Sequence, residues 1–371
     1  MVAMMNLKAK PFYLDDQDIA WVKSTLASMS LEDKVGQLFY LVLANEDVSG
    51  IEKAIDEIGL RPAGFMSRPF AGKIVQENYR HLQNCAKIPL LLSANIEKGG
   101  EGIATDGTFF GSQMEVAATG DVDMAYKLGL VAGRESVACG CNWAFAPVVD
   151  IDYNPDNPIT NTRSYGSDPA KVLEMAKAYL KGIRECDLAV SIKHFPGDGV
   201  DGRDQHLLTS VNSLSVKEWD KSYGLVYKGM IDAGAETVMV AHIMQPAYVK
   251  KLNPAIKDED VLPASLSYEL TTTLLRERLG FNGLVVTDAT TMAGFTIPMP
   301  RAKAVPAVIA AGCDIFLFTN NIKEDYGFML AGAEDGTLTP ERLDEAVTRI
   351  LALKASLKLH KKRRDELVPG E

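Results

Sequence analysis

The segment SIKHFPGDGVDGRDQHLLTS, residues 191–210, concentrates side chains that bind and transfer protons, including two of the five histidines in the chain. Lys193 and His194 end a strand-like apolar run. Asp204 and His206 stand two residues apart in a polar, glycine-rich stretch. In an extended loop such a pair points the same way, and the carboxylate orients the imidazole and raises its basicity. The pattern indicates a fixed Lys–His pair beside a mobile surface loop that carries a general acid/base. The alternative is an Asx-type turn with an exposed histidine.

Polar side chains end several other apolar runs, and they are Asn95, Asp150, Asp152, His242 and Asp288. A strand that emerges into water explains any one of them. Together with the run that ends in Lys193 and His194, five such strands favour a shared site, because polar groups at a buried strand end need partners or a ligand. Asp288, in LVVTDATTMAGF, could be a nucleophile, a base, a metal ligand or a helix N-cap. For His242, inside an apolar run, we expect a supporting role at the site, the alternative being a hydrogen-bonded core histidine.

Eight short apolar runs could form the strands that position these residues, and they span 36–43, 63–67, 88–95, 145–151, 188–195, 237–244, 283–289 and 314–319. Each is nearly all apolar rather than alternating, which is typical of parallel strands covered by helices. Helical patterns separate most of them. The sequence therefore predicts an α/β protein with a single (β/α)8 TIM-type barrel, whose polar strand ends meet at one mouth. A doubly wound sheet is the alternative.

The helical patterns between the runs have clear ends, and the longest cover residues 121–140, 215–235, 265–280 and 339–357. Ser30 and Asp33 form a variant of the capping box at the start of another helix. We expect the segment before residue 30 to form a helix packed on the barrel. The predicted organisation is therefore an N-terminal extension, residues 1–29, followed by a barrel domain, residues 30–371.

Composition restricts the classes of function. The 371 residues are 47% hydrophobic and 24% charged, with a net charge of −10, as in an ordinary globular protein. The basic run HKKRR at 360–364 is interpreted as a solvated helix end, so we expect no nucleic-acid partner. No apolar run approaches the ~20 residues of a membrane span, and the N-terminus lacks the apolar stretch of a secretory leader. We expect a cytoplasmic monomer or homodimer without membrane contact.

The five cysteines are Cys85, Cys139, Cys141, Cys186 and Cys313. Their number is odd and their spacing matches no common metal site, so we predict reduced, buried thiols. No metal and no cofactor are expected.

Several motifs occur in a characteristic order: MSLEDKVGQLF, NWAFAPVVDID, NTRSYGSDP, SIKHFPGDG, DQH, VMVAHI and LGFNGLVVTDATTM. From about residue 30 to 357, the chain resembles the catalytic barrel of glycoside hydrolase family 3. The D-x-H loop after K-H-F-P-G is similar to that of the β-N-acetylglucosaminidase branch of this family. Too little chain follows the last helix for the second sandwich domain of the family's β-glucosidases, so we expect a barrel without it.

The resemblance implies a retaining mechanism with roles for individual residues. Asp288 matches the nucleophile that forms a covalent glycosyl-enzyme, and His206 matches the acid/base, with Asp204 as its partner. Three residues match those that bind the hydroxyls of the sugar: Arg163, Lys193 and His194. Most retaining glycosidases use two carboxylates instead. An imidazole also repels an incoming anion less than a carboxylate does, so phosphate is a conceivable acceptor.

The sequence departs from the family pattern at three positions. Asn95 stands where the family usually has Asp, which removes a charge and adds a donor. Glu101 lies near the position of an arginine that contacts the sugar in the branch. Asp198 replaces the histidine of the usual G-H-G. The first two changes touch substrate recognition. Asn95 and His242 are also included among the candidate substrate-binding residues.

The leading hypothesis is a retaining exo-β-N-acetylhexosaminidase that cleaves terminal β-linked GlcNAc-type sugars from small carbohydrates. A family-3 β-glycosidase or glycoside phosphorylase with another sugar preference is the close alternative. A metal-dependent barrel hydrolase is a further alternative, with five candidate ligands: His194, His206, His242, Asp204 and Asp288. Against it, the D-x-H pair lies in a glycine-rich loop, which is a poorly preorganised metal site. A non-catalytic sugar-binding barrel is the last alternative.

Overall fold

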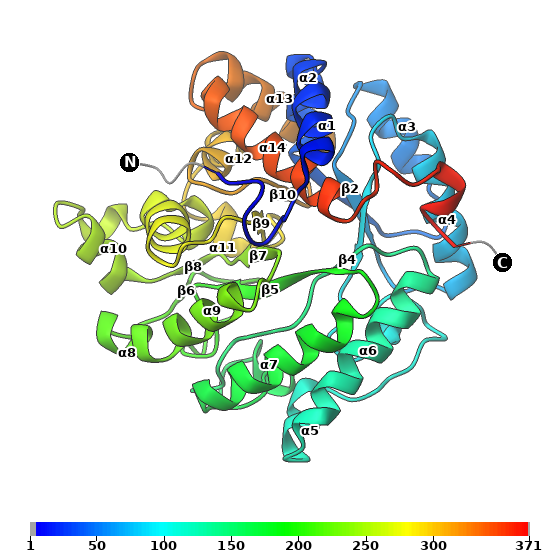
Figure 1. Cartoon of the computed structure of the whole chain (residues 1–371). Helices are drawn as coiled ribbons and strands as arrows, with labels where there is room; N and C mark the ends of the chain where they lie inside the picture. The colour runs from blue at the N-terminus through cyan, green and yellow to red at the C-terminus, as the bar shows by residue number, and fades with distance from the viewer. Residues whose placement is uncertain (1–4, 370–371) are drawn as a thin grey trace.

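Eight parallel strands form a barrel in the computed structural model, which describes residues 5–369 apart from the side chain of residue 365 (Figure 1). The strands are β1 (Phe39–Leu43), β2 (Gly64–Ser67), β3 (Leu91–Ala94), β4 (Trp143–Ala144), β5 (Ala189–Phe195), β7 (Thr237–Val240), β9 (Leu284–Thr287) and β10 (Phe316–Leu317). They pair in the order β10-β1-β2-β3-β4-β5-β7-β9. A bridge between Val286 and Ile315 joins the two ends of this order. The prediction of a TIM-type barrel is confirmed, and the doubly wound sheet is excluded.

The apolar character of the strands follows from their burial between the barrel interior and the outer helices. All residues of β2, β3, β5, β7 and β9 are buried. Inside, Trp143 packs its ring at 5.2 Å from Tyr40 and 4.7 Å from Phe145, in edge-on contacts that are favourable for aromatic pairs. This packed interior keeps the strands, and the residues that follow them, in fixed positions.

Two predicted strands differ from the observed ones. The fourth was expected at 145–151, but β4 is Trp143–Ala144 and only Val148 makes a further bridge, to Lys193. Pro147 in this stretch has no N–H to donate to a sheet. The run at 237–244 divides into β7 and β8 (Ile243–Met244), and β8 pairs with β6 (Ser210–Val211) in a separate two-stranded sheet.

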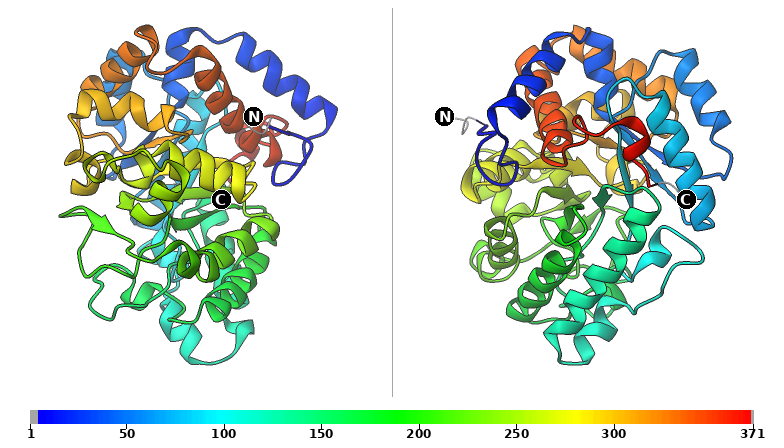
Figure 2. Two further views of the ribbon diagram at one scale, coloured as in Figure 1. Left: turned by 90° about the vertical axis from the view of Figure 1, so that its left-hand side faces the viewer. Right: turned by 45° about the vertical axis from the view of Figure 1, so that its right-hand side comes forward.

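Helices surround the barrel on its outside (Figures 1 and 2). The α-helices are α1 (Asp16–Ala27), α2 (Leu31–Gln37), α3 (Ser49–Glu57), α4 (Gly72–Cys85), α5 (Gln113–Ala118), α6 (Val122–Ala138), α7 (Pro169–Arg184), α8 (Val216–Lys221), α9 (Tyr223–Asp232), α10 (Pro246–Leu252), α11 (Ala293–Thr296), α12 (Arg301–Ala310), α13 (Ile322–Glu334) and α14 (Pro340–Ser356). Short 3-10 turns are η1 (Gly100–Gly102), η2 (Asn161–Arg163), η3 (Asp258–Asp260), η4 (Ala264–Leu266) and η6 (Arg364–Glu366). The ten-residue η5 (Glu269–Arg278) is a π-helix.

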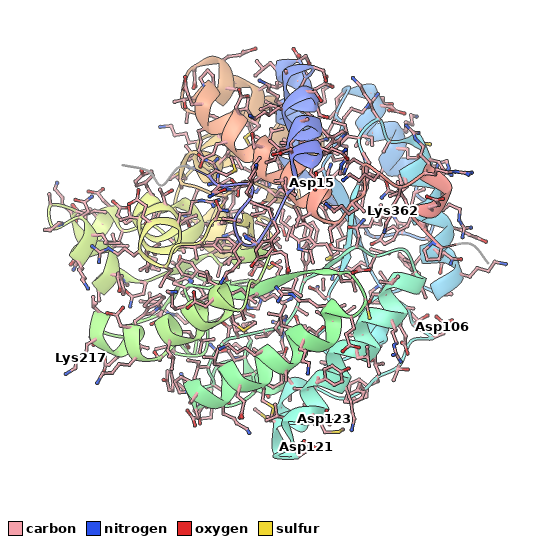
Figure 3. All side chains as sticks on the ribbon, in the orientation of Figure 1. Asp15, Asp106, Asp121, Asp123, Lys217 and Lys362 are labelled. Atoms are coloured by element: carbon pink, nitrogen blue, oxygen red, sulfur yellow. The ribbon has the colours of Figure 1, made fainter. Side chains whose placement is uncertain are left out.

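The first helix, α1, packs along α14, as Figures 1 and 2 show. The capping box predicted for Ser30 and Asp33 is present at the start of α2. Charged side chains such as Asp121, Asp123 and Lys217 project from the outer helices (Figure 3). The scattered charges of the sequence are therefore distributed over the outside of the barrel.

Among the described residues, no helix combines the length and apolar character needed to cross a bilayer. The cysteines are free thiols, and Cys139, Cys141 and Cys313 are buried as predicted. The prediction of buried thiols is wrong for Cys85, which is exposed, and only partly right for Cys186, which is half-buried. Cys85 is the last residue of α4, where the helix surface meets solvent.

Candidate active site

A pocket of about 240 Å³ opens at the carboxyl ends of the strands, where the barrel interpretation places chemistry. Its lining residues are Met66, Arg68, Asn95, Phe145, Ile159, Arg163, Lys193, His194, Gln205, His206, Met239, Asp288, Ala289, Leu317 and Phe318. Polar strand ends from β3, β5 and β9 thus converge on one site. A larger cavity of about 450 Å³ lies at the amino ends of β1–β3, and its lining comes mainly from helices and from the segments that precede these strands.

One buried carboxylate, Glu97, organises the cationic wall of the pocket. It accepts two hydrogen bonds from Arg163, one from Nε and one from Nη2, both at 2.8 Å. Its Oε1 also lies 2.6 Å from Lys193 Nζ, which donates to Asn95 Oδ1 at 3.0 Å. Burial alone would raise the pKa of Glu97, but Arg163 and Lys193 outweigh it and hold that pKa well below its usual range. Glu97 therefore stays ionised and fixes both cations in place.

The Lys–His pair of β5 is held by a second buried carboxylate, Asp150. Its Oδ2 lies 2.7 Å from His194 Nδ1, and its Oδ1 accepts from the His194 backbone N–H at 3.1 Å. Arg163 Nη2 lies 3.4 Å from His194 Nε2 on the other side of the ring. The imidazole is therefore clamped between an acid and a cation. Lys193 and His194 are 2% and 4% exposed, which agrees with the prediction of a fixed pair.

Asp204 and His206 form the second His–Asp pair of the site. Asp204 Oδ1 lies 2.7 Å from His206 Nδ1 and accepts from the His206 backbone N–H at 2.8 Å. The backbone bond makes this an Asx-type turn, so the predicted extended loop is wrong. The turn and the dyad coexist, because one carboxylate oxygen serves both. The His206 side chain is 51% exposed and lines the pocket, with Nε2 left to face a substrate.

The loop that carries this pair is anchored rather than a simple surface loop. Gln205, between the two residues, is buried, and its Oε1 accepts from the His242 backbone N–H at 3.0 Å. The carbonyls of Gln205 and His206 accept from Gly294 and Ala293, each at 3.0 Å. The loop is thereby attached to β7 and to the segment after β9. The prediction of a surface loop is therefore wrong for Gln205 and for the equally buried Asp198.

Asp288 follows β9 directly and enters the pocket. Its backbone N–H donates to Val240 O at 2.8 Å, and its Oδ1 accepts from Ala289 N at 2.7 Å. Burial raises the pKa of Asp288, but His194, the hydrogen bond from Ala289 N and Lys193 outweigh burial, and the net pKa is lowered. A carboxylate that stays ionised in such a pocket can attack an electrophilic carbon. The N-cap alternative does not hold, because Met292 occupies the N-cap of α11.

His242 lies behind this carboxylate rather than among the lining residues of the pocket. Its Nδ1 is 2.8 Å from Ser265 Oγ, and its Nε2 is 3.1 Å from Ala289 O. Burial lowers the pKa of His242 to about 4, against the opposing effect of Asp288, so the ring is neutral at pH 7. This position suits a residue that supports the segment of Asp288 and does not suit contact with a sugar.

Asp198 connects the two halves of the site. Its backbone N–H donates to Asp150 Oδ1 at 2.8 Å, while its side chain accepts from Asn157 at 2.8 Å and from Gln205 at 3.4 Å. Burial and the nearby Asp150 raise the pKa of Asp198. The sequence interpretation noted Asp198 only as a departure from a motif. Here it links the carboxylate of the fixed pair to the loop of the exposed pair.

Three of the five candidate metal ligands, His194, His206 and Asp288, line the pocket, but no three of the five bring donor atoms within 4.8 Å of one another. Among the described residues, one group of three or more His, Cys, Asp or Glu side chains brings its donor atoms within 4.8 Å of one another. That group is Glu52, His81 and Cys85, outside this pocket. The pocket is therefore arranged as hydrogen-bonded acid–base pairs rather than as a metal centre.

A TIM-type barrel with a polar mouth, an ionised aspartate and a His–Asp pair has the architecture of a barrel enzyme, a fold that hosts many chemistries. Residues 30–353 match the family model described as the glycosyl hydrolase family 3 N terminal domain. The chain belongs to glycosyl hydrolase family 3.

Named relatives agree with this assignment. The chain is 54% identical over 358 residues to a "Beta-N-acetylglucosaminidase/beta-glucosidase" of Cellulomonas fimi, covering 96% of this chain and 63% of the relative. It superposes on "Beta-glucoside phosphorylase BglX bound to 2FGlc" with a TM-score of 0.95 at 47% identity, covering 100% of this chain and 66% of that one. A family 3 beta-N-acetylglucosaminidase from Paenibacillus sp. str. FPU-7 gives a TM-score of 0.83 at 28% identity, over 91% and 64% of the two chains. The chain thus spans about two thirds of these relatives.

Proposed function

We propose that this barrel is a retaining, exo-acting β-glycosidase that releases terminal β-linked GlcNAc-type sugars. The observation that carries the proposal is that ionised Asp288 and the Asp204-paired His206 line one pocket. The pocket, about 240 Å³, is smaller than the ~300–1,000 Å³ of a typical drug-sized site, which suits a single terminal sugar ring. The names of the Cellulomonas fimi and Paenibacillus relatives support the choice of sugar.

The first half-reaction forms a covalent intermediate. An oxygen of Asp288 attacks the anomeric carbon, and the bond from that carbon to the leaving oxygen breaks. Protonated His206 gives its Nε2 proton to the leaving oxygen, so the departing alcohol is neutral. Asp204 stabilises the imidazolium before transfer and holds Nδ1 protonated after it, because its carboxylate lies 2.7 Å away.

The second half-reaction releases the sugar. Neutral His206 takes a proton from an incoming water, whose oxygen attacks the anomeric carbon and displaces Asp288 as a carboxylate. Two displacements at one carbon retain its β configuration. Meanwhile Arg163, Lys193 and His194 hold the hydroxyls of the ring, and Asn95 offers an amide where a carboxylate would be expected in the family.

Phosphorolysis is a second candidate, favoured by the charge of the pocket. Arg68, Arg163 and Lys193 line it, whereas Asp288 is the one carboxylate among its described lining residues. Three further carboxylates stand behind the lining and are paired: Glu97 with Arg163 and Lys193, Asp150 with His194, and Asp204 with His206. The charged groups that face the pocket are therefore mainly cationic. A phosphate dianion can therefore replace water as the acceptor, and the neutral imidazole of His206 does not repel it. The similarity to a structure titled as a β-glucoside phosphorylase supports this candidate.

The test is a panel of 4-nitrophenyl β-glycosides of GlcNAc, GalNAc, glucose and xylose, with and without phosphate. We expect the highest kcat/KM for GlcNAc. A free sugar as product supports hydrolysis, and a sugar 1-phosphate supports phosphorolysis. Asp288→Asn should abolish both, whereas Asp260→Asn, a matched change of an exposed aspartate in η3, should abolish neither. Turnover that survives in Asp288→Asn would refute the nucleophile, and a preference for glucose would reassign the sugar.

A further inference from the structure

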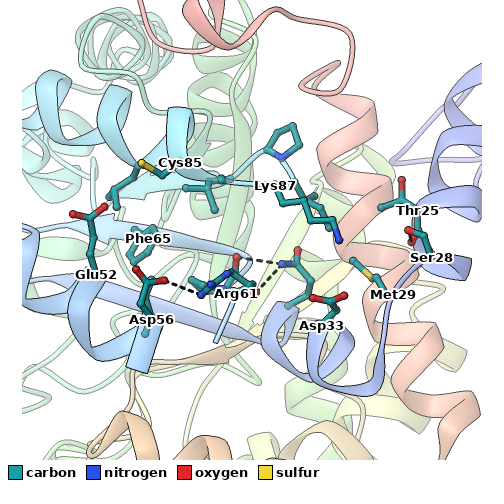
Figure 4. Close-up of a pocket in the computed structure, with 18 of the residues that line it drawn as sticks. Thr25, Ser28, Met29, Asp33, Glu52, Asp56, Arg61, Phe65, Cys85 and Lys87 are labelled. Carbon is teal, nitrogen blue, oxygen red and sulfur yellow. Dashed lines mark hydrogen bonds and ion pairs between the residues drawn. The ribbon is translucent and has the colours of Figure 1, made fainter. Parts of the chain in front are cut away.

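A second cavity lies at the opposite end of the barrel from the catalytic pocket. Its volume is about 450 Å³, and residues just before β1, β2 and β3 form part of its wall: Gln37, Pro62 and Leu90. Figure 4 shows Glu52 and Cys85 together on one side of this cavity, with Thr25 and Ser28 on the other. The mechanism uses none of these side chains. The cavity therefore requires a separate explanation.

Glu52, His81 and Cys85 form a cluster of metal-ligating side chains at the rim of this cavity. His81 and Cys85 are four residues apart on α4, so they lie on the same face of the helix. Glu52 comes from the neighbouring helix α3, and its Oε1 lies 2.8 Å from His81 Nε2. One donor atom from each of the three residues lies within 4.8 Å of the other two.

We propose that these three residues bind a Zn²⁺-type divalent ion. Zinc is bound by imidazole nitrogen, thiolate sulfur and carboxylate oxygen at 2.0–2.3 Å in tetrahedral geometry, which places donor atoms about 3.3–3.8 Å apart. In the cluster one donor pair lies at 2.8 Å and all donors lie within 4.8 Å of one another, so an ion would require only adjustments of about 1 Å. A thiolate with an imidazole selects zinc, cobalt or copper over magnesium and calcium.

The electrostatics of the rim agree with a cation site. Half of the His81 side chain and a quarter of the Glu52 side chain are exposed, and Cys85 is exposed, so an ion can enter from solvent. Binding exchanges the hydrogen of the His81–Glu52 contact for the ion and releases the thiol proton of Cys85 to solvent. The fourth coordination position is then open to water or to a small ligand in the cavity.

The bound ion would join α3 to α4, which are separate in sequence. Exposed hydrogen-bonded pairs of this kind contribute little to stability by themselves. An ion that binds the folded chain and not the unfolded chain stabilises it by mass action. The thermal midpoint should therefore rise with Zn²⁺ concentration and should not respond to Mg²⁺.

The decisive experiment is Co²⁺ titration of the purified full chain under reducing conditions, followed by Zn²⁺ displacement. Wild type should bind one Co²⁺ at this site, with a thiolate-to-cobalt charge-transfer band that Zn²⁺ removes. Cys85→Ser should lose the band, and His81→Gln should weaken Zn²⁺ binding about 100-fold or more. Cys186→Ser, a matched change of the half-buried cysteine of another segment, should keep both.

The band separates this site from any ion in the catalytic pocket, because the described lining of that pocket contains no cysteine. A band that persists in Cys85→Ser, or one that is lost in Cys186→Ser, would overturn the proposal. Equal Zn²⁺ affinities of wild type and His81→Gln would overturn it as well. Because the readout is not turnover, failure here leaves the proposed glycosidase function intact.

Discussion

The molecule contains two His–Asp pairs of the same length in very different surroundings. His194 and Asp150 meet at 2.7 Å, with side-chain exposures of 5% and 1%. His206 and Asp204 also meet at 2.7 Å, with exposures of 51% and 25%. The first pair ends a barrel strand, and the second sits in a turn after it. The same chemical unit is therefore held once in a buried position and once in contact with solvent.

In the proposed mechanism this difference separates sugar binding from proton transfer. The His194 ring lines the pocket but is only 4% exposed, and it is clamped between Asp150 and Arg163, so it suits a fixed contact with a sugar hydroxyl. The exposed pair can exchange protons with solvent between the two half-reactions, as an acid/base must. Gln205 keeps the exposed pair in place without burying His206 itself.

The largest effect is expected for His206→Ala. With a poorly activated β-glycoside, kcat/KM should fall by about 10³-fold, because general acid catalysis is lost. With a 2,4-dinitrophenyl glycoside, whose leaving group needs no proton, formation of the glycosyl-enzyme should change little. Steady-state kinetics with both substrates check this. As a control, Leu207→Ala, which alters the exposed neighbour in the same turn, should change the kinetics with neither substrate. An equal loss with both substrates in His206→Ala would point to a structural role.

Breaking the buried pair should mainly cost stability. Asp150→Asn removes the charge that orients His194 and that receives the Asp198 backbone N–H. Breaking a buried ion pair costs about 3–5 kcal/mol. Urea denaturation should show a loss near the lower end of that range, because the asparagine keeps the shape of the side chain. If Asp150→Asn were as stable as wild type, the buried pair would not have the role assigned to it.

The third histidine of the site, His242, is hydrogen-bonded to no carboxylate. It extends the comparison, because its burial should make stability depend on pH. Its pKa, lowered by burial to about 4, lies below the ordinary value of 6.5. Between those values the unfolded chain binds more protons than the folded chain, so stability should fall as the pH decreases from 6.5 to 4. The loss should approach about 3 kcal/mol at the acid end. Urea denaturation at several pH values in this range should show that the free energy of unfolding depends less steeply on pH in His242→Gln than in wild type. An unchanged dependence on pH would count against the assignment.

The smallest change in stability is expected for Asp204→Asn. Exposed ion pairs are worth about 0–1 kcal/mol, so the free energy of unfolding should stay within about 1 kcal/mol of wild type. The kcat for poorly activated glycosides should still fall, though less than in His206→Ala, because the imidazole remains but loses its orienting acid. Urea denaturation and kinetics on the same preparation check both statements. A larger loss of stability than in Asp150→Asn would reverse the comparison.

The barrel was predictable because strands that are buried on both faces must be apolar throughout, and the sequence contains such runs. The position of β4 was not, since Val148 and its neighbours are as apolar as a strand although Pro147 cannot donate to a sheet. Neither exposure nor pairing of Cys85 followed from its spacing to other cysteines. The donor atoms within 4.8 Å of its thiol belong to a histidine on the same helix and to a glutamate on the preceding one.

The candidate site was predictable where side chains follow strands directly, as for Asp288 and Lys193. The groups that hold them were missed. Glu97 meets Arg163 across 66 residues of sequence, and Gln205 contacts the backbone of His242 across 37. Such pairings depend on the closed barrel rather than on local pattern. The one available signal for Glu97 was a carboxylate two residues beyond a strand-end asparagine.

The most direct test of the division between the two pairs is azide rescue of His206→Ala and His194→Ala, side by side, with an activated aryl β-glycoside. Azide needs no general base to attack the glycosyl-enzyme. The account predicts that azide accelerates turnover of His206→Ala and yields a β-glycosyl azide, while His194→Ala shows no such acceleration. Rescue of His194→Ala instead, or an α-configured product, would contradict the assignment of His206 as the acid/base of a retaining mechanism.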